Sequence, residues 1–101
     1  MSAQTAGRPV EILLVEDNPG DIRLTVEVLK EADVRTNLSV VKDGVEAMAF
    51  LRREGHYTDA PRPDLILLDL NLPKKDGMEL LSDMNRDQIL KDIRVVILTT
   101  S

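Results

Sequence analysis

Apolar residues gather in four short runs along the chain, at residues 10–15, 38–41, 65–68 and 95–98. Runs of this length with little polar alternation are typical of strands buried on both faces of a parallel sheet. A helix is the competing interpretation for 65–68, but Pro61, Pro63 and Pro73 bracket that run too closely for one. The run at 38–41, extended back to Thr36, is the more polar one and is predicted to be an edge strand.

Between these runs, apolar residues recur at helical spacing and predict three helices, over about 22–32, 45–54 and 78–84. Asn18 or Asp21 is expected to cap the first helix. Asp43-Gly44 is predicted to be a plain turn. Met48, Met78 and Met84 are expected in the core.

The elements therefore alternate in the order β-α-β-α-β-α-β. This order predicts an α/β fold, a doubly wound parallel sheet with helices on both faces and right-handed crossovers. We expect one domain, residues 10–101, after a disordered N-terminal tail at residues 1–9.

Polar residues follow three of the predicted strands directly. Glu16 and Asp17 come after the first strand, Asp69 after the third and Thr99 after the last. Because the carboxyl ends of parallel strands share one edge, we expect these four side chains to meet there, where open α/β sheets bind ligands.

Three carboxylates in one small site repel each other, and a cation normally neutralises such a cluster. An all-oxygen ligand set favours Mg²⁺, which often shares its shell with a phosphate. An aspartate beside Mg²⁺ can itself attack phosphorus. Taken singly, Glu16 and Asp17 could be solvated acids, Asp69 a loop cap and Thr99 an ordinary strand residue; their joint position at one edge favours function.

Composition excludes several classes of function. The net charge of −5 argues against nucleic-acid binding, and the absence of cysteine excludes disulfides and thiolate metal sites. No apolar run approaches the ~20 residues of a membrane span, and residues 1–8 do not form a secretory signal. A cytoplasmic protein without a membrane partner is expected.

Neither a phosphate-binding P-loop nor a dinucleotide-binding glycine motif occurs. A phosphatase of the Asp-x-Asp type would need an acid two residues after Asp69, where Asn71 stands. A phosphorylated Asp69 would then persist longer, as suits a switch more than a phosphatase.

Three motifs carry a resemblance to a known family: Ile-Leu-Leu-Val-Glu16-Asp17-Asn18, Leu-Leu-Asp69-Leu-Asn71-Leu-Pro73-x-x-Asp-Gly77, and Val-Val-Ile-Leu-Thr99-Thr100. The chain resembles the receiver domains of two-component response regulators, which have a flavodoxin-like fold. The stretch from Glu16 to Asp21 and the long loop before Asp69 are similar to stand-alone receivers associated with phytochrome-type kinases.

The resemblance implies a role for each matching residue. Asp69 would accept a phosphoryl group from a sensor histidine kinase, a partner of the phytochrome-like type. Mg²⁺ would be bound by Asp17, Asp69 and the backbone carbonyl of Asn71, with Glu16 holding a metal-bound water. Thr99 would bond the phosphoryl group and switch conformation, and the backbone N–H of Thr100 would also bind the group.

One departure from the family is large. Receivers continue with a further helix, strand and helix, and their fifth strand carries a lysine that pairs with the phosphoryl group. The sequence ends at Ser101, so a C-terminally truncated receiver is expected. The apolar edge at 95–98 would then be unpaired, which favours a homodimer or a strand-exchanged oligomer.

The main functional hypothesis is a phosphorelay switch that is not a turnover enzyme. The alternative is a receiver-like interaction module that does not switch because the lysine and the output face are absent from this sequence. A Mg²⁺-dependent phosphatase of related architecture is a third hypothesis.

Overall fold

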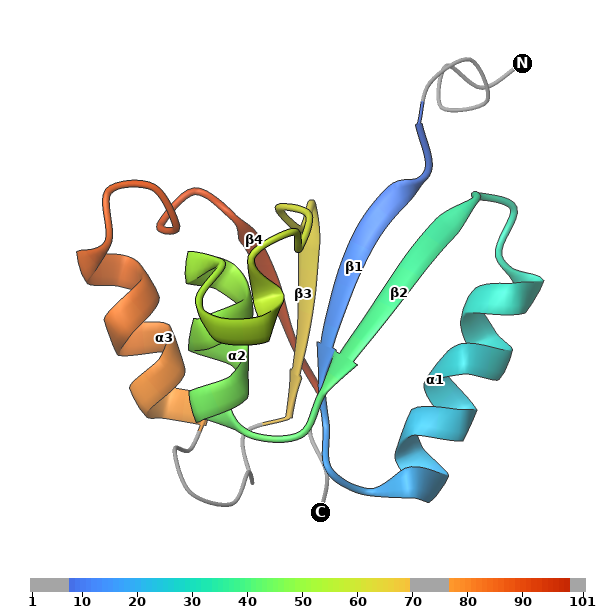
Figure 1. Ribbon diagram of the computed structural model, residues 1–101. Coiled ribbons are helices and arrows are strands. Elements are labelled where there is room, and N and C mark those ends of the chain that lie inside the picture. Colours follow the sequence, from blue (N-terminus) through green and yellow to red (C-terminus); the bar gives the residue numbers. More distant parts are fainter. Residues whose placement is uncertain (1–7, 70–76, 99–101) are drawn as a thin grey trace.

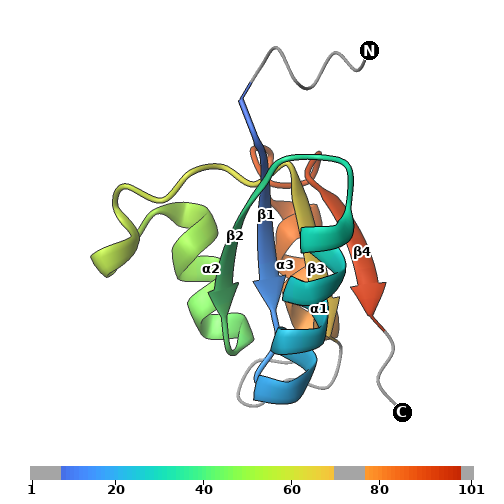
Figure 2. The same cartoon turned by 90° about the vertical axis from the view of Figure 1, so that its right-hand side faces the viewer.

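The computed structural model describes residues 8–69 and 77–98. Their strands form one parallel four-stranded sheet in the order β2-β1-β3-β4. Helix α1 covers one face of the sheet, and α2 and α3 cover the other (Figures 1 and 2). The elements in chain order are β1 (Val10–Val15), α1 (Pro19–Glu31), β2 (Thr36–Val41), α2 (Gly44–Arg52), the short 3-10 helix η2 (Gly55–Tyr57), β3 (Leu65–Asp69), α3 (Gly77–Arg86) and β4 (Arg94–Leu98).

The predicted doubly wound α/β fold and the order of its elements are confirmed, and β2 is an edge strand as expected. Helix α1 begins three residues before the predicted start, because Asn18 caps it and Pro19 occupies its first turn. The side-chain oxygen of Asn18 accepts a hydrogen bond from the Asp21 N–H at 3.0 Å.

The predicted plain turn at Asp43-Gly44 is wrong. Asp43 is the N-cap of α2, and its Oδ1 accepts a hydrogen bond from the Glu46 N–H at 2.8 Å. Asp43 is also buried, at 5% exposed. An Asp-Gly pair is common in both turns and helix starts, and the acid three residues later was the signal for a cap.

The main core lies between the sheet and the α2/α3 layer. It joins alternate residues of the strands to the inner faces of both helices: Leu13, Val15, Val41, Ala47, Met48, Phe50, Leu51, Ile66, Leu68, Leu80, Met84, Leu90 and Ile93. The face under α1 is thinner. The predicted inward residues of α1, Ile22, Val26 and Leu29, are only half-buried.

One of the three methionines expected in the core is not there. Met48 and Met84 are buried, but Met78 is 61% exposed. The buried face of α3 is formed by Gly77, Leu80 and Met84, a spacing of three and four residues. Met78 also fits the apolar periodicity, which is why the pattern placed it wrongly.

Strand β4 is not buried on both faces, although its sequence is typical of such a strand. Val96 and Ile97 are 47% and 43% exposed. Within residues 8–69 and 77–98, β4 pairs only with β3 and has no strand on its other side.

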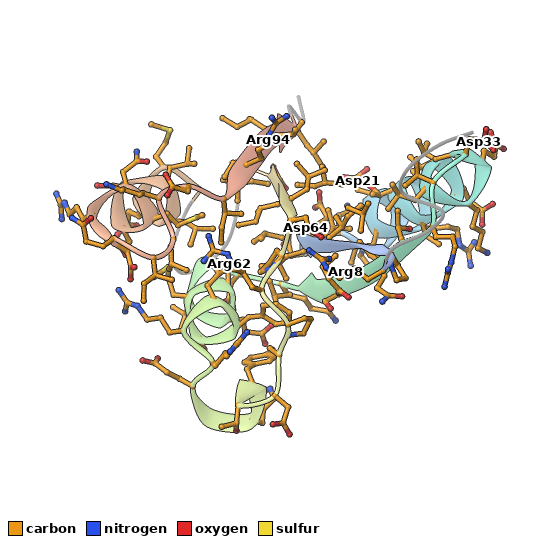
Figure 3. All side chains as sticks on the ribbon, turned by 90° about the horizontal axis from the view of Figure 1, so that it is seen from above. Arg8, Asp21, Asp33, Arg62, Asp64 and Arg94 are labelled. Carbon is orange, nitrogen blue, oxygen red and sulfur yellow. The ribbon has the colours of Figure 1, made fainter. Side chains whose placement is uncertain are left out.

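An ion pair joins the segment just before β1 to the segment just before β3. The Arg8 guanidinium donates to both carboxylate oxygens of Asp64 at 2.7 Å, and the Glu11 N–H donates to Asp64 at 2.9 Å (Figure 3). These bonds lower the Asp64 pKa from 3.8 to about 2. Arg8 and Pro9 belong to the predicted tail, whose extent stays a prediction.

No helix of the described segments is long and apolar enough to cross a membrane.

The core predicts a strong contrast between two leucine truncations. Leu80 is fully buried and Leu24 is 65% exposed. Leu80→Ala should lower the free energy of unfolding by about 2–5 kcal/mol, because it leaves a cavity. Leu24→Ala should change it by less than about 0.5 kcal/mol. Urea unfolding followed by circular dichroism measures both values, and equal losses would contradict this assignment of the core.

The Arg8–Asp64 pair predicts a pH effect in acid. Because folding lowers the Asp64 pKa, its contribution to stability is present above pH 3.8 and is lost as the pH falls toward about 2. The effect should be small, since both side chains are exposed. Thermal melts of the native chain and Arg8→Ala should differ at pH 6 and converge near about pH 2. A difference that persists unchanged at the acid end would contradict this contribution.

Candidate metal and phosphoryl site

Three acidic side chains meet at the carboxyl edge of the sheet. Parallel pairing sets Val15 opposite Leu68, so the residues that follow them leave the sheet side by side. Oxygens of the Glu16, Asp17 and Asp69 carboxylates all lie within 4.8 Å of one another. The predicted convergence of these three residues is therefore present in the structure.

The three acids differ in their surroundings. Glu16 is 1% exposed and Asp69 is 3% exposed, whereas Asp17 lies on the surface. The cluster therefore has a buried floor of two carboxyl groups and one acid that solvent reaches. Solvent therefore reaches the cluster at Asp17.

Backbone geometry holds Glu16 in place. Its N–H donates to the Val41 carbonyl at 3.0 Å, which extends the pairing of β1 with β2 by one residue. Its Oε2 accepts a hydrogen bond from the Asn18 N–H at 3.1 Å. Asn18 also caps α1, so the same short turn both starts the helix and orients the acid.

Burial is the first cause that raises the pKa of Glu16 above its ordinary value of 4.5. The charge of Asp69, hydrogen bonding with that carboxyl and the charge of Asp21 raise this pKa further, while the Asn18 N–H lowers it. Burial therefore dominates, and repulsion from the neighbouring carboxylate adds to it, as the sequence predicts for converging acids. A cation placed between the two carboxylates would lower this pKa.

The donor set fits a hard divalent cation. All three side chains offer carboxylate oxygen, and no histidine or cysteine contributes within the described segments. Oxygen ligands suit Mg²⁺, Ca²⁺ or Mn²⁺ better than zinc or copper. The cluster is therefore an acidic site that could bind a divalent metal.

Three other predicted site residues, Asn71, Thr99 and Thr100, lie outside the described residues. Two contributions were not predicted: the Asn18 N–H bond to Glu16 and the influence of Asp21 on the Glu16 pKa. Asn18 and Asp21 were predicted as capping candidates and belong to the stretch that carries the resemblance, but no role toward Glu16 was predicted for them. Their closeness to Glu16 follows from the tight turn between β1 and α1, which a pattern of apolar residues does not describe.

Comparison with known proteins now decides the family. The family model of the response regulator receiver domain matches residues 12–101. The chain belongs to this family. It is 55% identical to response regulator Rcp1 of Synechocystis sp. over 93 residues, 92% of this chain and 63% of the relative. It is 42% identical to the probable methanogenesis regulatory protein FilR2 of Methanothrix harundinacea over 94 residues, 92% of this chain and 59% of the relative.

Solved structures agree with the fold. The phosphorylated cyanobacterial phytochrome response regulator RcpA has a TM-score of 0.87 at 56% identity, covering 93% of this chain and 67% of that chain. The Mn²⁺-bound form of response regulator Rcp1 has a TM-score of 0.88 at 55% identity, covering 92% of this chain and 67% of that chain. The receiver resemblance and the flavodoxin-like fold are thereby confirmed, although the chain spans less than two thirds of the two curated relatives.

The acid cluster predicts that a divalent cation stabilises the fold. Adding Mg²⁺ at about 100 times its dissociation constant should raise the free energy of unfolding by about 2–3 kcal/mol near neutral pH. Asp17→Asn should remove most of this gain, because it takes away the exposed carboxylate of the cluster. Thermal melts with Mg²⁺ and with EDTA measure the effect. Asp59→Asn, an exposed acid outside the cluster, is the control, and an equal loss in both variants would contradict the site.

Proposed function

We propose that this receiver accepts a phosphoryl group on Asp69 from a phosphohistidine of a sensor histidine kinase. The proposal is carried by one observation: Asp69 ends a central strand with two more carboxylates within 4.8 Å. The solved structures of phosphorylated RcpA and of Mn²⁺-bound Rcp1, both similar to this chain, support it.

In the proposed reaction, a carboxylate oxygen of Asp69 forms a bond to phosphorus. The bond from phosphorus to the histidine nitrogen breaks, and its electron pair leaves with the imidazole. The pairing of β3 with β1 and β4 fixes the backbone of Asp69 at the end of the strand. The attacking carboxylate therefore starts from a defined position. Phosphoryl transfer depends on such positioning and on neutralised charge more than on an acid or a base.

Mg²⁺ is the proposed cofactor, and when bound it supplies the positive charge that offsets the phosphoryl oxygens and the carboxylates. Asp17 and Asp69 would bind it directly, together with the backbone carbonyl of Asn71, and Glu16 would hold one of its waters. The exposed position of Asp17 supports its direct role, because this carboxylate is the one in the cluster that solvent reaches.

Thr99 and Thr100 are the proposed partners of the phosphoryl group. They directly follow β4, whose Leu98 pairs with Asp69 in the sheet register. This register supports a Thr99 hydroxyl that bonds the phosphoryl group and moves when it arrives, and a Thr100 N–H that also binds it. The added charge of about −1.5 to −2 would bias this arrangement and make the chain a switch rather than a turnover enzyme.

The wider context of the proposal follows the relatives. A phytochrome-like kinase is the proposed partner, since RcpA is described as a phytochrome response regulator. The receiver would comprise residues 10–101 behind a tail at 1–9 and act in the cytoplasm, with no nucleic-acid or membrane partner. The exposed edge of β4 supports self-association, as a homodimer or by strand exchange.

Phosphorylation can be tested without the kinase. With Mg²⁺ and acetyl phosphate, intact mass spectrometry should show the mass of one added phosphoryl group, labile to alkali. Asp69→Asn should show none, Asp17→Asn far less than the native chain, and Asp59→Asn the same as the native chain. A native chain that stays unmodified, or an Asp69→Asn variant that gains the same mass, would contradict the proposed function and favour a non-switching interaction module.

A further inference from the structure

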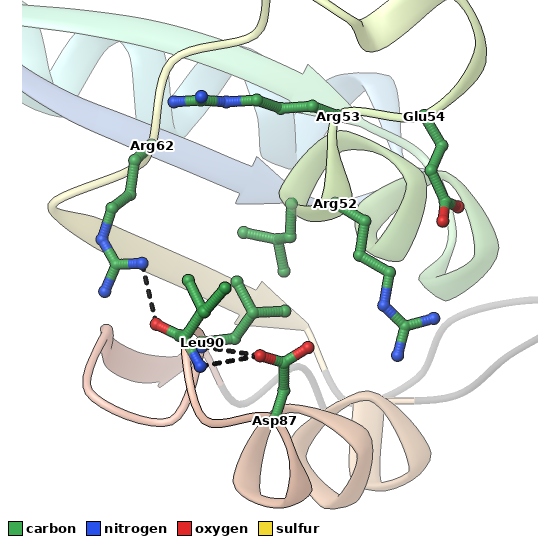
Figure 4. Close-up of a pocket in the computed structure, with 8 residues that line it drawn as sticks. Arg52, Arg53, Glu54, Arg62, Asp87 and Leu90 are labelled. Carbon is green, nitrogen blue, oxygen red and sulfur yellow. Dashed lines mark hydrogen bonds between the residues drawn. The ribbon is translucent and has the colours of Figure 1, made fainter.

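A second feature lies at the opposite edge of the sheet from the acid cluster. The C-terminal end of α2, the loop before β3 and the connection from α3 to β4 surround a groove of about 500 Å³ (Figure 4). Because helices and strands run in opposite directions in this fold, the end of α2 lies at the amino edge of the strands. Its lining residues are Leu51, Arg52, Arg53, Glu54, Arg62, Asp87, Ile89 and Leu90.

The groove combines apolar and basic surfaces. Leu51 and Leu90 are buried apolar residues, at 9% and 3% exposed, while Ile89 beside them is 70% exposed. Ile89 thus adds an exposed apolar side chain to the two buried leucines, and together they offer one apolar wall to a ligand. Arg52, Arg53 and Arg62 supply the basic groups around it (Figure 4).

The shape of the groove is supported by hydrogen bonds rather than by loose side chains. The Arg62 guanidinium donates to the Ile89 carbonyl at 2.8 Å and ties the two connections together. One carboxylate oxygen of Asp87 accepts from the N–H groups of Ile89 and Leu90, at 2.8 and 3.1 Å. The negative charge of Asp87 is therefore partly satisfied by the backbone and competes less for an incoming ligand.

The guanidinium groups of Arg52 and Arg53 are available to bind a ligand. Among the ion pairs and hydrogen bonds between described residues, neither guanidinium has a partner. Arg53 also has a left-handed backbone, with φ 57°, at the end of α2, a position where glycine or asparagine is more stable than a long side chain. The helix end thus carries an arginine where its backbone conformation favours a different residue.

The groove extends beyond this cavity. A smaller adjoining hollow of about 160 Å³ is lined by Arg52, Asp83, Arg86 and Asp87. The two share Arg52 and Asp87, so a continuous surface runs from Arg62, past Arg52, to the last turn of α3. Arginines and acids alternate in this lining, and a charged surface that spans the ends of two helices suits an extended chain better than a compact small molecule.

From these observations we propose that this surface, the arginine groove, docks an acidic peptide segment of a partner protein that carries an apolar anchor residue. The carboxylates of the segment pair with the guanidinium groups of Arg52 and Arg53, and the anchor packs against Leu51, Leu90 and Ile89. Glu54 and Asp83 limit how many acids the groove accepts. Three arginines and two acids line the larger cavity, so it carries a local positive charge in a chain whose net charge is −5, and this favours the approach of acidic groups.

The arginine groove and the acid cluster lie at opposite edges of the sheet, so a ligand can occupy one without covering the other. The five residues of β3 separate the two edges, a distance of about 17 Å. A partner bound in the groove would leave the exposed Asp17 accessible. The receiver could therefore be held by one protein while a different protein exchanges a phosphoryl group at Asp69.

The test uses a short fluorescein-labelled peptide of glutamates around two central leucines, titrated with the native chain by fluorescence anisotropy. Saturable binding is expected, weakening as salt is added. A peptide with lysines for glutamates should not bind, and one with serines for leucines should bind at least about fivefold more weakly. In NMR spectra of the chain, the changes in backbone amide chemical shift on addition of the peptide should localise to residues 51–54 and 87–90.

Two variants separate binding from stability. Arg52→Gln with Arg53→Gly should weaken peptide binding by about tenfold or more, while the melting temperature is maintained, because glycine suits the left-handed position. Arg35→Gln, which changes an exposed arginine just before β2, is the matched control and should bind as the native chain does. Equal binding by the double variant, no saturable binding by the native chain, or preferential binding of ATP or of a short RNA would each overturn the proposal.

Discussion

The parallel register of β1 with β3 is the constraint on which the functional edge depends. Val15 lies opposite Leu68, so the chain leaves both strands at the same level and delivers Glu16, Asp17 and Asp69 to one place. Burial of the apolar residues behind them fixes this register, because a shift by one residue would turn Leu13 and Ile66 out of the core. The hydrophobic effect thereby holds together acids that repel each other.

Folding does not relieve the repulsion between these carboxylates, because it keeps them close together. Glu16 and Asp69 are almost fully buried, and the pKa of Glu16 is raised first by its own burial and then by the charge of Asp69. A structural acid pair of this kind only lowers stability, whereas a ligand site uses the same repulsion as affinity for a cation. The exposed position of Asp17 beside the pair provides the access that a purely structural pair would lack.

Much of this could be predicted from the sequence, and the errors have physical causes. The four strands and the meeting of Glu16, Asp17 and Asp69 follow from strand patterns and from the geometry of parallel sheets. Met78 was misplaced because its spacing fits the apolar face of α3 as well as Leu80 does, and only packing selects between them. Asp43 was misread because turns and helix caps use the same residues. The arginine groove was missed because Arg52 and Arg62 lie on separate segments. Only the folded path of the chain from α2 to β3 brings them to one cavity, and a sequence pattern does not describe that path.

The central claim is that the three carboxylates form one site whose repulsion a divalent cation relieves. Carbon-13 NMR of the side-chain carboxyl groups, followed as a function of pH with and without Mg²⁺, tests it most directly. We expect a Glu16 pKa above 4.5 without the cation, a clear fall when Mg²⁺ is added, and paramagnetic broadening of all three carboxyl signals by a trace of Mn²⁺. An ordinary Glu16 pKa that Mg²⁺ does not change, or broadening at other acids instead, would contradict it.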